Sequence, residues 1–90
     1  MLTPTTNDAE ALALAAMAAT LTDERRARRF LDLTGLNVGE LRERAGAGDR
    51  SLLGATIAFL EGHEPDLVAV AEAIGSSPAE LVAAREVLER

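Results

Sequence analysis

Apolar residues recur at helical spacing along most of the chain, and short groups of glycine, proline and helix-capping residues interrupt them. This spacing places the apolar side chains on one face of an α-helix. Strict alternation and Asn-Gly turns, which are typical of strands, are almost absent. The pattern therefore predicts an all-α fold, a compact orthogonal bundle of five or six short helices.

The capping signals predict where the first two helices begin and end. Asn7 is predicted to cap a first helix, with Glu10 reaching back in a capping box, and this helix extends to Leu21. Thr22 is predicted to cap a second helix that ends before Gly35. Residues 1–6 are expected to be a flexible N-terminus of one domain that spans residues 1–90.

Four further helices are predicted from the same kinds of signal, including a proline that opens each of the last two. Their expected extents are Asn37 to Arg44, Asp49 to Glu61, Pro65 to Gly75 and Ser77 to about Leu88.

One group of helix-end residues occurs twice, forty positions apart. The matched residues are Gly35, Asn37, Glu40 and Leu41 in the first copy and Gly75, Ser77, Glu80 and Leu81 in the second. Two interpretations stay open. A three-helix unit is repeated in tandem, or the two junctions share only the simplest way of joining helices.

The segment Ala11 to Leu21 is apolar almost all round, unlike the other predicted helices. Such a helix lies at the centre of its own bundle or is shared with another chain. We place it at the centre of the bundle and keep a second copy of the chain among the expected partners.

Composition removes several classes of function. The chain has no cysteine, so it forms no disulfide and no cysteine-based metal site. The formal charge of −6 gives an average field that repels nucleic acid and anionic lipid. The uncharged run Ala11 to Leu21 is about half the roughly 20 residues that span a bilayer. We therefore expect a cytoplasmic protein without a membrane segment.

Three segments resemble a family of small uncharacterised bacterial proteins. They are Arg29 to Leu36, Ile57 to Leu60, and Ala71 to Gly75 before the proline that opens the last helix. The family is catalogued as a domain of unknown function and is found mostly in alphaproteobacteria. The resemblance implies an all-α fold and no established activity, so it transfers no catalytic residue.

The segment from Val70 to Leu88 has the spacing of a helix-turn-helix unit, with Gly75 at the turn. Its charge does not suit DNA. Residues 51–90 hold seven acidic residues against two arginines, whereas phosphate contacts dominate affinity for DNA. A nucleic-acid-binding regulator is therefore the alternative function and not the first.

Four arginines crowd one turn and a half of the second predicted helix: Arg25, Arg26, Arg28 and Arg29. They are expected to face solvent, opposite an apolar stripe, and two interpretations stay open. They form a contact surface for a partner, or a solvated helix face with local ion pairs.

The remaining candidates for chemistry are weak. His63, the only histidine, stands among acidic residues without a second histidine or cysteine, so we expect no metal site. Serines and threonines serve as caps, so we expect no catalytic residue, no cofactor and no small-molecule substrate. The sequence favours a small non-enzymatic protein-interaction module, with another protein or a second copy as the partner.

Overall fold

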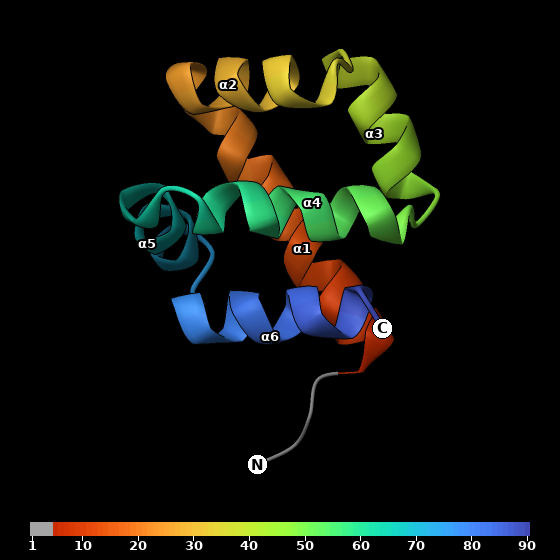
Figure 1. Cartoon of the computed structure of the whole chain (residues 1–90), viewed down its shortest axis with the longest axis vertical. Helices are drawn as coiled ribbons and strands as arrows, with labels where there is room; N and C mark the ends of the chain where they lie inside the picture. The colour runs from red at the N-terminus through yellow and green to blue at the C-terminus, as the bar shows by residue number, and fades with distance from the viewer. Residues whose placement is uncertain (1–4) are drawn as a thin grey trace.

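The computed structural model describes residues 5–90 and confirms the all-α prediction (Figure 1). The described residues form six helices and no strand. The helices are α1 (Thr6–Thr22), α2 (Glu24–Thr34), α3 (Val38–Gly46), α4 (Arg50–Glu61), α5 (Glu64–Ala73) and α6 (Pro78–Leu88). Residues 1–4 of the expected flexible N-terminus lie outside the described residues.

The last four helix starts lie at or within one residue of their predicted positions. Asn37 accepts a hydrogen bond from the Glu40 backbone N–H at 2.8 Å, and the Glu40 side chain completes the capping box. Asp49 and Ser77 cap α4 and α6 in the same way, each through its side-chain oxygen. Side chains that satisfy the free N–H groups of a first turn thus determine where these three helices begin.

Two predicted caps are wrong, each by a short distance. Thr5, and not Asn7, caps α1 and forms the capping box with Asp8, so the helix begins earlier than predicted. Asp23, and not Thr22, caps α2 and accepts from the Arg26 N–H at 2.8 Å. Both prediction errors have one cause, because more than one nearby residue could serve as the cap.

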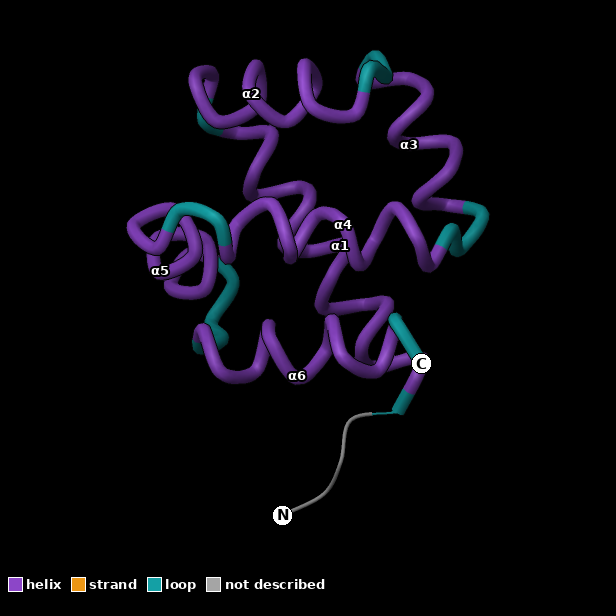
Figure 2. The backbone as a smooth tube through the Cα atoms, in the orientation of Figure 1, coloured by secondary structure: helices purple, strands orange, loops and turns teal. Residues whose placement is uncertain are grey.

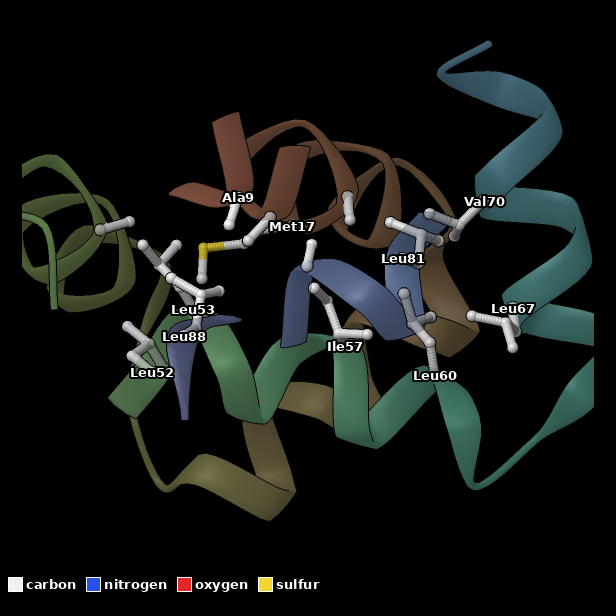
Figure 3. Packing of buried hydrophobic residues seen from close by; sticks show 14 of the residues in the cluster. Ala9, Met17, Leu52, Leu53, Ile57, Leu60, Leu67, Val70, Leu81 and Leu88 are labelled. Atoms are coloured by element: carbon white, nitrogen blue, oxygen red, sulfur yellow. The ribbon is translucent and has the colours of Figure 1, made fainter. Parts of the chain in front are cut away.

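Helices α1, α4 and α6 form the centre of the molecule. The most extensive contacts are those of α6 with α1 and with α4, and α5 packs on α4 and α1 (Figures 1 and 2). Met17, Leu53 and Leu88 lie together in one part of the core, and Leu60 and Val70 lie in another (Figure 3). Because α1 supplies small buried side chains such as Ala9, Ala13 and Ala16, its neighbours can approach it closely.

The segment Ala11 to Leu21 is central, as predicted, but it is not covered on every side. One line of α1 remains exposed to solvent: Asn7, Ala11, Leu14, Ala18 and Thr22. These residues are three or four positions apart, so they share one face of the helix. The central helix therefore carries a largely apolar strip that no other part of the described chain covers.

Helices α2 and α3, together called the arm, lie at one end of the long axis, and α6 lies at the other (Figure 1). Helix α2 packs mainly on α1, and α3 packs on α4. The arm contributes only three buried residues to the core: Phe30, Leu41 and Ala45.

No single helix of the described chain is both long and apolar enough to cross a membrane. Only α5 and α6 taken together reach that length and composition, and the two are bent by 96° at their junction.

Candidate functional site

The structure divides the four predicted contact arginines into two pairs. Arg26 and Arg29 turn toward α5 and meet Asp66, whose side chain is only 8% exposed. The Nη1 atom of Arg29 donates a hydrogen bond to Oδ2 of Asp66 at 3.3 Å, and Nε of Arg26 lies 3.3 Å from Oδ1. These two arginines balance the charge of a buried carboxylate and join α2 to α5.

The other pair faces solvent. Arg28 forms only an ion pair with Glu24 at 3.6 Å, and both side chains are largely exposed. Arg25 is exposed and forms no ion pair among the described residues. The expectation that all four arginines face solvent is wrong for Arg26, whose side chain is only 14% exposed. Its guanidinium group forms an ion pair with the buried carboxylate of Asp66.

An aromatic contact supports the same joint between the arm and the rest of the molecule. The rings of Phe30 on α2 and Phe59 on α4 have centroids 5.1 Å apart and are tilted by 55°. The guanidinium carbon of Arg29 lies 5.5 Å from the centroid of the Phe59 ring. Both contacts have favourable geometry for aromatic and cation–π attraction, so Arg29 has a structural role.

His63 lies at this joint as well. Its Nδ1 atom lies 3.5 Å from Oδ2 of Asp66. Within residues 5–90, no group of three or more histidine, cysteine, aspartate or glutamate side chains is arranged to hold a metal ion. The acidic neighbours that the sequence places around His63 therefore do not converge on a common point.

Helices α5 and α6 cross in the manner of a helix-turn-helix unit, with their axes bent by 96°. The arginine in the last turn of α6 already forms ion pairs within the described chain. Arg85 donates hydrogen bonds to Glu61 on α4 and to Glu89, and these two carboxylates raise the pKa of Arg85 above its ordinary value. The exposed positions of α6 are then mostly acidic or apolar, with Glu80 and Glu86 among them.

A mainly apolar recess lies between α1 and α3. It has a volume of about 410 Å³ and is lined by Leu14, Met17, Ala18, Leu21, Thr22, Arg42, Ala45 and Gly46. Its floor is the exposed strip of α1, where Leu14 is 39% exposed. Its α3 wall consists of Ala45, Gly46 and the side chain of Arg42.

A second recess of about 420 Å³ continues from the first between α1 and α2. It is lined by Leu21, Thr22, Glu24, Ala27, Arg28, Leu31 and Asp32. Leu21 and Thr22 line both recesses, and the two recesses together are here called the groove. Ala27 and Leu31 of α2 lie in the groove and are only half-buried.

Sequence reasoning did not identify the groove, although one signal for it was present. The sequence places Leu14 and Ala18 on one side of an apolar helix, yet the packing elsewhere decides which side stays uncovered. The spacing of Leu14, Ala18 and Thr22 by four residues shows that they would share a face, whichever way that face points.

Residues 6–90 match a protein family described as "Protein of unknown function (DUF3572)". This match covers nearly the whole chain and confirms the resemblance to a domain of unknown function. No curated protein and no solved structure is significantly similar to the chain.

Proposed function

The chain belongs to the DUF3572 family, whose function is unknown, and we propose from its own surface that it is a non-enzymatic protein-interaction module of the bacterial cytoplasm. The groove between α1, α2 and α3 carries this proposal. It presents Leu14, Ala18 and Leu31 on a surface that the described chain leaves open. Exposed apolar patches with polar rims are typical of protein-binding sites.

The distribution of charge supports the same surface. Residues 23–45 carry six of the nine arginines and five of the fifteen acidic residues. The rest of the chain carries three arginines and ten acidic residues. Most of the molecule therefore repels another acidic macromolecule, and the arm beside the groove does so least.

The four predicted contact arginines take different parts in this proposal. Arg25 and Arg28 remain available to a partner, and Arg28 lies on the rim of the groove. Arg26 and Arg29 act indirectly, because their contacts with Asp66 hold α2, which forms one wall.

A pull-down from a lysate of the native host tests the proposed function with two matched variants. Ala18→Glu places a charge on the floor of the groove, at an exposed position that tolerates it. Ala69→Glu makes the same change at an exposed position of α5 that lines neither recess. We expect the wild type and Ala69→Glu to recover the same protein, and Ala18→Glu to recover about tenfold less. Equal recovery by all three would contradict the proposal.

The alternative function, nucleic-acid binding through α6, is favoured by the 96° crossing of α5 and α6 alone. Titration of a labelled DNA duplex at low salt tests it by fluorescence anisotropy. A saturable rise that is lost in Arg90→Glu would favour this alternative, because Arg85 is occupied by Glu61 and Glu89.

A further inference from the structure

The shape of the groove restricts what kind of protein segment it can accept. A partner strand would need an exposed sheet edge, and residues 5–90 contain no strand. A polyproline segment would need an aromatic-lined groove, and neither phenylalanine lines the two recesses. Of these three modes, the apolar lining of the groove best fits an amphipathic helix laid into it.

The two recesses suit such a helix. They are similar in size, at about 410 and 420 Å³, and Leu21 and Thr22 line both of them. A helix presents apolar side chains at positions i, i+4 and i+7 of one face. Successive side chains of this face could enter the two recesses in turn, with Ala18 and Thr22 beneath the helix.

The charged residues around the groove are unequally placed. Glu24, Arg28 and Asp32 line the α2 side, where the two acids flank the arginine along the helix. Arg42 is the only charged residue that lines the α3 side, and it forms no ion pair among the described residues. The α3 side therefore offers an unpaired cation beside the more apolar of the two recesses.

We propose that the groove binds an amphipathic α-helix of another protein, one that carries carboxylates along the edge that faces Arg42. This inference rests on the proposed function and adds the chemistry of the partner. Apolar side chains supply most of the binding, and the carboxylates fix the direction and the register of the bound helix.

A selection from a library of helical peptides tests this inference and does not require the partner to be identified first. The library varies the apolar face and both flanking edges of one peptide scaffold, and the full-length protein is the bait. We expect wild-type protein to enrich peptides with large apolar residues at i, i+4 and i+7 and with Asp or Glu along one edge.

Charge-reversed variants of α3 then test the role of Arg42. Arg44→Glu is the matched control, because Arg44 is exposed on the same helix and lines neither recess. We expect Arg42→Glu to weaken binding of the enriched acidic peptide about tenfold by fluorescence anisotropy, and Arg44→Glu to weaken it less than about threefold.

The following outcomes would overturn the inference, and they differ in whether the proposed function fails as well. If wild-type protein enriches no peptide beyond the Ala18→Glu bait but still recovers a protein in the pull-down, only the helical partner fails; if both experiments fail, the proposed function fails as well. If it enriches apolar faces without acidic edges, or if Arg42→Glu binds as well as wild type, only the acidic chemistry of the partner fails. If light scattering shows a dimer that Ala18→Glu dissociates, a second copy occupies the groove instead.

Discussion

The α2–α3 arm and the α5–α6 pair have matching residues at their helix ends, but they differ in how much of their surface is buried in the core. Gly35 and Gly75 both have φ of 70°, and the leucines forty positions apart, Leu41 and Leu81, are both fully buried. Yet α2 has one buried residue, Phe30, whereas α5 and α6 have four each. Helix-end signals thus determine where a helix starts and stops, and not how deeply it packs.

The difference follows from the side chains between those ends. Helix α2 carries four arginines, one glutamate and one aspartate in eleven residues, so most of its surface must stay in contact with water or with a counter-ion. Helix α6 offers an apolar face that fits between α1 and α4. The matched junctions leave the tandem-repeat interpretation open, because equal helix ends do not require a common origin.

Truncation of the two matched leucines should give the largest difference between the two regions. We expect Leu81→Ala to lower the free energy of unfolding by about 4 kcal/mol, and Leu41→Ala by about 2 kcal/mol. Both side chains are fully buried, but α3 lies at the edge of the molecule, where the arm can close over the cavity. Urea unfolding followed by circular dichroism measures both values, since the chain has no Trp or Tyr.

Native-state hydrogen exchange on the wild type sharpens this prediction. Amides of the arm should exchange through a partial opening, whereas buried amides of α6 should exchange only on global unfolding. Equal losses of stability for Leu41→Ala and Leu81→Ala, together with uniform protection, would mean that the arm is as integral to the core as α6.

Neutralisation of Asp66 should have the next largest effect, because it breaks the charged joint between the arm and α5. We expect Asp66→Asn to lower the free energy of unfolding by about 1–3 kcal/mol, since it leaves Arg26 beside a neutral amide. Arg29 is half-exposed and can turn to water, which limits the loss. Thermal unfolding at neutral pH measures the change.

The control for Asp66→Asn is Glu64→Gln in the same first turn of α5, where the side chain is exposed. It removes one negative charge near the same helix end and should change stability by less than about 0.5 kcal/mol. If the two variants are equally stable, the contacts of Asp66 do not hold the arm in place.

The two matched glycines should give equal and smaller effects. At Gly35 and Gly75 an added Cβ would meet no atom within 4 Å, so the cost of alanine is only that of a left-handed backbone. We expect each Gly→Ala substitution to lower the free energy of unfolding by about 1 kcal/mol. Urea unfolding of the pair checks this, and a difference above about 0.5 kcal/mol would show that packing, and not local conformation, dominates at one site.

The sequence predicted those features that depend on neighbouring residues. Helical periodicity predicted five or six helices, of which the structure has six, and caps such as Asn37 and Ser77 were assigned to the correct residues. The sequence could not show that Asp66, one of several acidic residues around His63, would be buried against Arg26. That contact joins residues forty positions apart, and only the packing of α2 near α5 brings them together.

The groove was missed for the same physical reason. Nothing in the local pattern distinguishes Leu14, which stays exposed, from Leu12, which packs against the core. The incorrect cap at Thr22 is a smaller failure of another kind, because Thr22 and Asp23 are both good cap residues and only their backbone conformation decides between them.

The smallest expected effect concerns Asp23, whose side chain caps α2, whereas α5 has no side-chain cap. The hydrogen bond from the Arg26 backbone N–H, more than any other contact, lowers the pKa of the Asp23 carboxyl below its ordinary value of 3.8. A lowered pKa in the folded state means that the cap stabilises α2 fully above the ordinary value and loses this effect as pH falls through the folded value. The first turn of α2 should therefore loosen in acid, and the Arg26 amide resonance should report the change by NMR. Asp23→Asn keeps an uncharged cap and should remove this dependence on pH. An unchanged titration of the Arg26 amide in Asp23→Asn would assign the effect to another group.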